Sequence, residues 1–352
     1  MAADDSAPTE GVWAERKLRF RTAEELAADP TWGQVEWIAE PWLAAGSITE
    51  LDGKVKIAGK TTWALNLCRS ALDGAPFIGE KTLQTPVVFL TEQNEVSFRA
   101  AMERAGLLGR PDFIVLFWHD TLGITWRDIV CGAVRECQRR GARVLVVDTI
   151  AQFARLAGDS ENNAGDALEA MRPLQAAAAA GIAVLVLRHE RKSGGEVGDS
   201  GRGSSAFAGA VDVVLSLRRP DGKVRPSVRV IHAVSRFSET PDELVIELTP
   251  DGYVAHGTAP DVAHQEALEI VLGAIPQSEG AAITIEQIID ETSATRTTVQ
   301  RAISELLAGM RIARTGKGRS GDPFRYYVSG SAQTPSPGEQ NGQRESEPQS
   351  QT

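Results

Sequence analysis

Short, mostly apolar runs alternate with longer segments of helical periodicity between residues 47 and 250. The runs are ITELDG (48–53), PVVFLT (86–91), FIVLFW (113–118), ARVLVVD (142–148), IAVLVL (182–187) and VDVVLSL (211–217). Such runs are typical of strands buried on both faces, so the pattern predicts a mostly parallel sheet covered by helices. Two further runs, 227–237 and 243–254, alternate apolar with polar residues and predict an antiparallel extension with a turn at Pro241 and Asp242. The expected fold class is α/β, with this domain over residues 47–256.

The pattern changes character beyond this domain. Helical patterns at 264–275, 284–292 and 295–310 precede a two-strand hairpin at 311–328. This order predicts a small winged helix-turn-helix domain over 263–328, after a linker at 257–262. A lead-in rich in tryptophan, 13–46, is expected to pack on the first domain. The polar ends, 1–12 and 329–352, are expected to be disordered because they cannot bury enough apolar surface.

Composition excludes some classes of function. The chain has 42% hydrophobic and 24% charged residues, and no apolar run approaches the roughly 20 residues that a membrane span needs. The N-terminus, MAADDSAPTEG, has neither the positive start nor the apolar stretch of an export signal, so we expect a cytoplasmic protein without a membrane partner. With a net charge of −10, any contact with nucleic acid has to come from local basic patches or an assembled channel.

The segment LDGKVKIAGKTTW (51–63) predicts a phosphate-binding loop between a strand and a helix. Backbone N–H groups of such a loop, bounded here by Gly53 and Gly59, form a positive concavity suited to ATP. Lys60 is placed to reach the β- and γ-phosphates, Thr61 to bind Mg²⁺ and Thr62 to support the α-phosphate. Five residues instead of the usual four separate the two glycines, so the loop has to bulge. The alternative is a chance match in an ordinary turn.

Two apolar strands end in carboxylates that fit the same site. Asp148 ends the run 142–148, where a carboxylate can hold Mg²⁺ or its water. Glu92 follows the run 86–91, where it can orient and deprotonate the attacking water. Glu95 is a less well placed competitor. Either residue could instead be a simple loop carboxylate.

The set GKTT, FLTEQNE, VVDT, LRHERKSGG and GRGSSAFAGAVDVVL, in this order, resembles the RepA-like branch of the RecA-type P-loop ATPases. That group is best known as hexameric replicative helicases of plasmids and phages. The resemblance covers residues 13–250 and implies a RecA-like P-loop NTPase core. It departs from the family in the lengthened phosphate loop, which bears on the rate of hydrolysis more than on nucleotide binding.

The resemblance also implies roles for three further residues. His189 matches a polar residue that senses the γ-phosphate, although a histidine that caps a strand is the plainer alternative. Arg202 lies in a glycine-rich segment that matches the loop lining the DNA channel, where it could contact the DNA backbone or remain a solvated charge. Arg236 is similar to the finger residue that acts on a neighbouring subunit's nucleotide, which implies a homo-oligomer, with a hexamer favoured.

The C-terminal segment carries basic residues within an acidic protein. In a helix-turn-helix, the start of the second helix is the end that contacts base edges. Basic residues lie near the start of the expected second helix and in the hairpin that follows it. These features predict DNA contact, with single-stranded DNA as the expected partner of the whole protein. Winged helices also serve as protein-interaction modules, which is the alternative. The candidate residues are Arg296, Arg301, Arg314, Lys317 and Arg319.

These features together predict an ATP-hydrolysing DNA motor, a RepA-like helicase or helicase-like ATPase of a mobile element. A recombination, repair or helicase-loading ATPase remains open. So does a DNA-binding regulator that uses ATP only as a switch.

Overall fold

The computed structural model describes residues 18, 20–156, 160, 163–190, 206–220 and 225–329. It divides into two compact units, Met1–Ala259 and Pro260–Thr352. Of the ends for which we predict disorder, 1–12 and 329–352, all residues except Ser329 lie outside the described residues, and so does Arg202.

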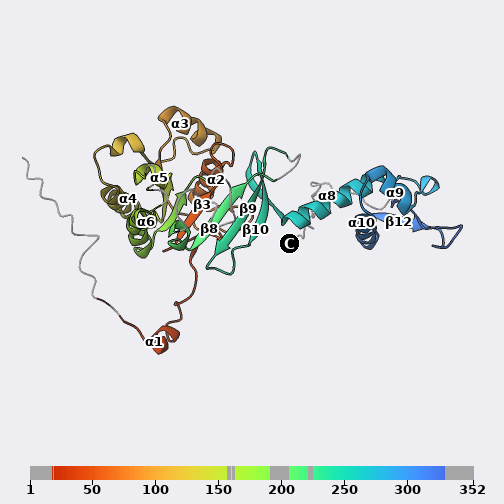
Figure 1. The fold of residues 1–352 in the computed structure, drawn as a ribbon, viewed down its shortest axis with the longest axis horizontal. Coiled ribbons are helices and arrows are strands. Elements are labelled where there is room, and N and C mark those ends of the chain that lie inside the picture. The colour runs from red at the N-terminus through yellow and green to blue at the C-terminus, as the bar shows by residue number, and fades with distance from the viewer. Residues whose placement is uncertain are drawn as a thin grey trace, which may run out of the picture. The chain divides into compact units, whose positions relative to one another are not determined.

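The first unit is built on a nine-stranded sheet in the order β11-β10-β9-β8-β3-β7-β6-β4-β5 (Figure 1). From β8 to β5 all neighbouring strands pair in parallel, as the apolar runs predict. These strands are β3 (Ile48–Asp52), β4 (Val87–Thr91), β5 (Phe113–Phe117), β6 (Val144–Asp148), β7 (Ala183–Leu187) and β8 (Val213–Arg218). The expectation of an α/β fold with a mostly parallel sheet is confirmed.

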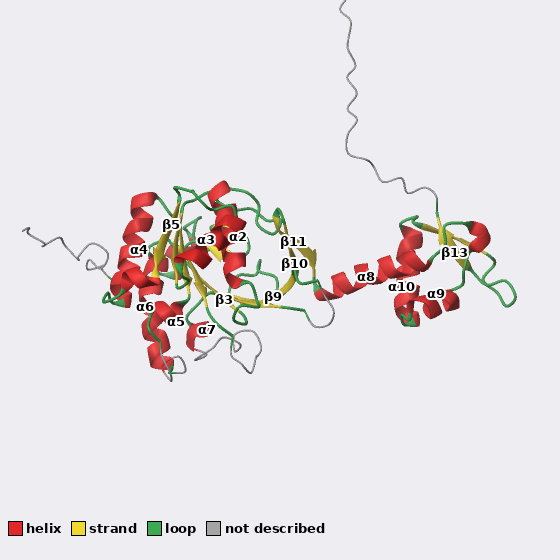
Figure 2. Cartoon of the chain, turned by 90° about the horizontal axis from the view of Figure 1, so that it is seen from above, coloured by secondary structure: helices red, strands yellow, loops and turns green. Residues whose placement is uncertain are grey.

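Helices cover both faces of this sheet because the strands are apolar on both sides. On one face the core joins α2 (Lys60–Asp73) and α3 (Glu95–Arg104), with Trp63 and Phe98 fully buried. On the other face α4 (Trp126–Arg140) and α6 (Ala164–Ala179) supply the apolar side chains, and Figure 2 shows these two helices on the same side of the sheet. Three short helical segments complete the unit: η1 (Trp118–Thr121), α5 (Ile150–Phe153) and α7 (Ala206–Gly209).

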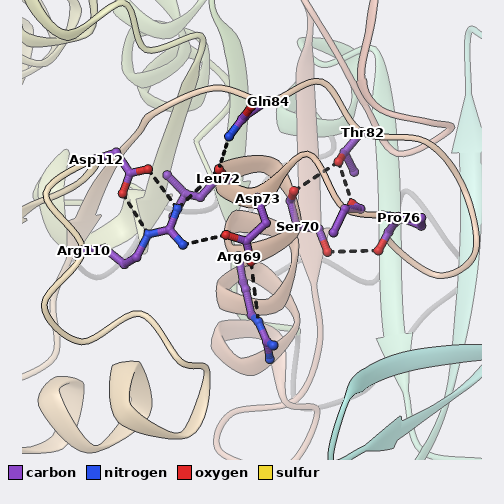
Figure 3. A network of polar contacts seen from close by, with 10 residues as sticks. Arg69, Ser70, Leu72, Asp73, Pro76, Thr82, Gln84, Arg110 and Asp112 are labelled. Carbon is purple, nitrogen blue, oxygen red and sulfur yellow. Dashed lines mark hydrogen bonds and ion pairs between the residues drawn. The ribbon is translucent and has the colours of Figure 1, made fainter.

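Helix α2 is fixed at both ends. Its N-cap is Gly59, whose φ of 87° is a left-handed conformation that favours glycine, and its C-cap is Gly74 with φ 62°. At its last turn, Arg110 donates to Asp73 at 2.6 Å and to Asp112 at 2.9 Å, and also to the carbonyl oxygen of Leu72 at 3.3 Å (Figure 3). The positive charge of Arg110 also interacts favourably with the negative, C-terminal end of the helix dipole. The helix therefore has a firm base opposite the end that carries Lys60.

The antiparallel extension contains three strands: β9 (Val228–Ser235), β10 (Glu243–Thr249) and β11 (Gly252–Gly257). The turn expected at Pro241 and Asp242 lies between β9 and β10. The run 243–254, which we predict as one strand, instead folds back on itself, with Thr249 paired to Gly252. The sequence Pro-Asp-Gly at 250–252 explains this second turn, because proline suits its first central position and glycine its last position.

The lead-in is only partly packed on the sheet unit. Its hairpin, β1 (Trp37–Ala39) and β2 (Leu43–Ala44), places Trp42 against Trp63 with ring centroids 6.5 Å apart. Trp37 packs edge-on against Phe237 at 5.3 Å. The side chains of helix α1 (Ala23–Ala27) are not buried, and Trp32 is 55% exposed.

The second unit contains α8 (Ala259–Ala274), η3 (Glu279–Ala281), α9 (Ile285–Thr292) and α10 (Arg296–Ala308), then β12 (Ile312–Thr315) paired with β13 (Arg325–Val328). A bridge from Ile283 to Tyr326 adds a short third strand. Its own core includes Leu268, Ile288 and Val299. The expected linker 257–262 runs into α8 at Ala259, since Pro260 is tolerated in a first helical turn.

No helix in the described part of the chain combines the length and the apolar character that a membrane span requires.

Candidate functional site

Four neighbouring parallel strands bring the predicted site residues to one edge of the sheet. In spatial order, β3 leads into the phosphate loop, β7 is followed by Arg188 and His189, β6 ends in Asp148 and β4 is followed by Glu92. The carboxyl ends of parallel strands share an edge, so each strand delivers a polar residue beside the next. The backbone N–H of Glu92 donates to the carbonyl of Asp148 at 2.7 Å, which joins two of these ends directly.

The phosphate loop packs closely at Gly53 and leads into α2 at Gly59. A Cβ atom at Gly53 would lie 2.7 Å from both the Leu217 carbonyl oxygen and the Ala58 Cβ, so only glycine fits there. Lys60 opens α2 and is 6% exposed. Its Nζ donates to the Gly53 carbonyl oxygen at 2.7 Å. The lysine therefore folds back across the mouth of its own loop.

Thr61 and Asp148 are in direct contact. The hydroxyl of Thr61 donates to Asp148 Oδ2 at 2.8 Å and accepts from Gln93 Nε2 at 3.1 Å. Burial raises the pKa of the Asp148 carboxyl to about 6, an effect that the hydrogen bond from Thr61 opposes and the charge of Glu92 reinforces. Burial lowers the pKa of Lys60, while the charge of Asp148 opposes that change. The edge therefore holds an ammonium and a carboxylate in a confined space.

Glu92 is oriented by two partners. Its Oε2 accepts from the Thr149 hydroxyl at 2.7 Å, and its Oε1 lies 3.8 Å from His189 Nε2. Burial acts to raise the pKa of Glu92, but the nearby His189 and the hydrogen bond from Thr149 outweigh it and hold the pKa below its ordinary value. The other ring nitrogen of His189, Nδ1, is 3.4 Å from Lys60 Nζ. His189 thus lies between the lysine and the glutamate.

These side chains surround a cavity of about 820 Å³. Thr62 also lines it, as do residues of α3 and of the strand ends. Free N–H groups at the start of α2 and the ammonium of Lys60 favour an anion at one wall. The carboxylates favour a cation at the opposite wall of the cavity. A phosphate chain with a divalent cation fits this division of charge.

The donor set suits Mg²⁺. When Mg²⁺ binds together with phosphate, water and phosphate oxygens fill most of its coordination shell, and the protein supplies only a few oxygen ligands. The Thr61 hydroxyl and the Asp148 carboxylate, which are in contact, are ligands of this kind. The described residues contain no group of three or more His, Cys, Asp or Glu that could enclose a metal ion by themselves. The ligand set therefore fits an ion bound together with nucleotide.

Arg236 is not in this cavity. It follows the end of β9, which runs antiparallel to β8, and so lies at the amino edge of the parallel strands. Its Nη1 donates to Asp212 at 3.0 Å, and Asp212 also accepts from the backbone N–H of Ile48. Within one chain Arg236 is therefore remote from Lys60, and its predicted role in a neighbouring subunit stays a prediction.

Sequence reasoning missed three residues that contact the site. Gln93 and Thr149 directly follow Glu92 and Asp148, and their positions at the carboxyl ends of strands are a signal that could have identified them. Arg229 on β9 donates from Nε to the Ala58 carbonyl at 2.8 Å and from Nη2 to the Ile57 carbonyl at 3.1 Å. Nothing in the local sequence indicates that this arginine meets the phosphate loop.

Five of the six basic residues predicted to contact DNA, all except Arg202, lie exposed on the second unit. Arg296 and Arg301 are on α10, and Arg296 is paired with Glu286 at 3.1 Å. Arg314 on β12 lies over the Phe324 ring at 4.4 Å. Lys317 and Arg319 lie in the exposed connection between β12 and β13.

Comparison with known proteins gives a family. Solved structures with a similar fold include a KaiC-like protein of the hyperthermophilic archaeon Pyrococcus horikoshii OT3 (15% identity, TM-score 0.46, covering 63% of this chain and 98% of that one). A RadB recombinase is also similar (18% identity, TM-score 0.44, covering 60% and 91%). No curated protein sequence matches the chain. The family model described as AAA domain (AAA_25) matches residues 14–195, which is more than half of the chain. The protein therefore belongs to this AAA domain family, a family of RecA-like P-loop ATPases.

Proposed function

We propose that this protein is an ATP-hydrolysing DNA motor, a RepA-like helicase or helicase-like ATPase of a phage, plasmid or other mobile element. One observation carries the hydrolytic part: Lys60, Thr61, Asp148 and Glu92 line one cavity at the carboxyl edge of the sheet. These are the groups that triphosphate binding, metal binding and water activation require.

Nucleotide binding uses the charges at the loop. The ammonium of Lys60 gives up its hydrogen bond to the Gly53 carbonyl and binds phosphate oxygens instead. The N–H groups at the start of α2 donate to the phosphate chain of the nucleotide. Thr61 and Asp148 would hold Mg²⁺, which would neutralise negative charge on the phosphates.

Hydrolysis is assigned to Glu92. Its carboxylate, whose pKa stays below its ordinary value despite burial, orients a water and accepts its proton. The Thr149 hydroxyl holds the carboxylate in place. His189, near both Lys60 and Glu92, is positioned to register whether the γ-phosphate is present. In an assembly, Arg236 of one subunit stabilises charge at the nucleotide of the next.

The second unit supports contact with DNA. Its order of helices and its two-stranded sheet match a winged helix, with α9 and α10 as the helix-turn-helix. Arg301, Lys317 and Arg319 are exposed, and these three have no ion pair within the described residues. Phosphate contacts from such residues attach the ATPase to DNA without defining a sequence.

The test is phosphate release with and without single-stranded DNA, measured over a range of protein concentration. We expect turnover that rises with single-stranded DNA and with concentration, and none in Lys60→Ala. Equal rates in Lys60→Ala and the wild type would refute the site. Strand displacement on a forked duplex then separates unwinding from a recombination or loading role.

One alternative is favoured by the lengthened phosphate loop. A DNA-binding regulator that uses ATP as a switch would bind nucleotide and release no phosphate in any condition. Binding without turnover, with or without single-stranded DNA, would establish that alternative.

A further inference from the structure

The phosphate loop is held from outside by a single arginine. The first residues of β9 lie at the carboxyl edge of β8, and Arg229 there extends its guanidinium behind the loop. Two of its nitrogens donate to the Ile57 and Ala58 carbonyls, while Nη1 donates to the Pro226 and Val228 carbonyls at 2.6 and 2.7 Å. The guanidinium therefore joins the entry of β9 to the loop.

This arrangement is unusual for a cation. Arg229 is half-buried, and burial lowers its pKa, yet its partners in the described part of the chain are four carbonyl oxygens and no carboxylate. A planar guanidinium with five N–H donors can satisfy such a set, which an ammonium cannot do in the same geometry. An ordinary surface ion pair does not account for this residue.

The contacts fall where the loop needs support. Residues 54–57 are exposed, so the core does not enclose their side chains. Lys56 takes a left-handed φ of 61°, which is unfavourable for a residue other than glycine. Within the loop, the Ala58 N–H donates to the Lys54 carbonyl at 3.2 Å. Arg229 holds the two peptides between this bulge and Gly59.

The direction of the held carbonyls affects the cavity. In a trans peptide the carbonyl and the N–H point to opposite sides of the chain. Because the Ala58 carbonyl faces Arg229, the Gly59 N–H of the same peptide points away from the guanidinium. Gly59 lines the cavity, and a Cβ there would lie 4.0 Å from Arg229 Nε, so the arginine is directly behind it. An N–H group is thereby directed to where phosphate binds.

We propose that Arg229 is a positioning residue for the phosphate loop, which holds the Ile57 and Ala58 carbonyls so that a loop with a surplus residue still presents the Gly59 N–H to a triphosphate. The inference rests on the proposed ATP site. It assigns to Arg229 no contact with nucleotide.

The first experiment measures the dissociation constant for Mg·ATP with a fluorescent analogue, beside thermal unfolding. We expect Arg229→Ala to weaken binding by about tenfold, in line with the loss of charge-assisted hydrogen bonds, with kcat less affected than KM. Arg229→Lys keeps the charge and should recover part of the affinity. Arg225→Ala is the matched control, since Arg225 is exposed nearby and pairs with Glu247 instead of the loop.

The second experiment removes the surplus residue. Deletion of Val55, which is exposed, restores four residues between Gly53 and Gly59. In that background Arg229→Ala should cost much less affinity than in the full-length loop. An equal loss in both backgrounds, or a deletion variant that no longer binds Mg·ATP, would overturn the link to the lengthened loop.

The outcomes separate this inference from the function beneath it. Wild-type affinity in Arg229→Ala, with binding abolished in Lys60→Ala, overturns the role of Arg229 and leaves the ATP site intact. Equal binding by the wild type and Lys60→Ala removes the site itself. If Arg229→Ala does not fold, the affinity of Arg229→Lys decides, and a wild-type value there contradicts the proposal.

Discussion

Lys60 and Asp148 are both nearly inaccessible to solvent, at 6% and 4% exposure, and each makes the burial of the other tolerable. Burial disfavours the charged form of both, and their opposite charges counter that effect. Groups of this kind, in a cavity large enough for a ligand, are typical of functional sites. The contact of Thr61 with Asp148 adds a hydroxyl to the groups at this edge of the sheet.

At the residue scale, Glu92→Gln should separate binding from hydrolysis. The amide cannot accept a proton from water, so kcat should fall by about 10² to 10⁴, while the affinity for Mg·ATP stays near that of the wild type. Thr149→Val should cause a smaller fall, because it frees the carboxylate without removing it. Phosphate release and nucleotide binding on the same preparations measure both.

Glu95→Gln is the control for this prediction. Glu95 is exposed, lies 3.4 Å from His119 and does not line the cavity. Its replacement should leave turnover unchanged. Near-wild-type phosphate release by Glu92→Gln would exclude Glu92 as the base.

At the element scale, Glu247 holds the antiparallel strands together. Its carboxylate on β10 accepts from the Ser227 hydroxyl at 2.8 Å, lies 3.1 Å from His256 on β11 and pairs with Arg225 at 3.0 Å. The hydrogen bond from Ser227 is the largest cause that lowers the pKa of Glu247 from its ordinary value of 4.5, and His256 and Arg225 add to it.

This shift predicts a pH dependence of stability. A lowered folded-state pKa means that the carboxylate stabilises the fold above 4.5, and that this contribution is lost as pH falls through the folded-state value. Glu247→Gln should therefore unfold at a lower temperature than the wild type near neutral pH. The difference should shrink at acidic pH, as followed by circular dichroism melts. A difference that is independent of pH would contradict this account.

The helix-turn-helix and hairpin of the second unit give a prediction about salt. If Lys317 and Arg319 bind phosphates, each alanine substitution should weaken DNA binding and reduce the slope of log affinity against log salt by about one. Arg296→Ala should have a smaller effect, because Glu286 already holds that guanidinium. Fluorescence anisotropy with single-stranded and duplex DNA measures these slopes.

Arg172→Ala serves as the control for the salt series. Arg172 is an exposed, ion-paired residue on α6 of the first unit. Unchanged affinity and slope in Lys317→Ala and Arg319→Ala would favour a protein-interaction role for the second unit.

At the scale of the whole molecule, Arg236 decides whether activity requires assembly. It lies at the sheet edge opposite the cavity, so the proposed role at a nucleotide requires the cavity of another subunit. Arg236→Ala should bind Mg·ATP normally and release phosphate slowly. Mixing it with Lys60→Ala should restore part of the turnover, because some mixed interfaces then combine an intact cavity with an intact finger.

The outcome of that mixture is decisive. If the subunits exchange and the mixture releases phosphate no faster than the sum of the two variants alone, Arg236 does not act in trans. Sedimentation of each variant confirms whether the assembly itself is preserved.

Much of the first unit could be predicted because its strands differ sharply in pattern from its helices. Apolar runs of five or six residues predicted β4, β6 and β7. The residues at the end of each strand were the candidates for the site. The prediction failed where the alternating run 243–254 contained a turn, since periodicity alone does not show that Pro250 ends one strand. The contacts of Gln93 and Thr149 could be inferred only from their neighbours.

The sequence by itself determined the kind of fold and the chemistry at the strand ends, because hydrophobic period and residue type are local properties of the chain. It also determined that the phosphate loop carries a surplus residue. Only the tertiary structure decided which side chains meet. Arg229 is about 170 positions from Ala58 in the chain, and the pairing of β9 beside β8 brings the two into contact. The same pairing carries Arg236 to the far edge, since an antiparallel strand places its two ends at opposite edges of the sheet.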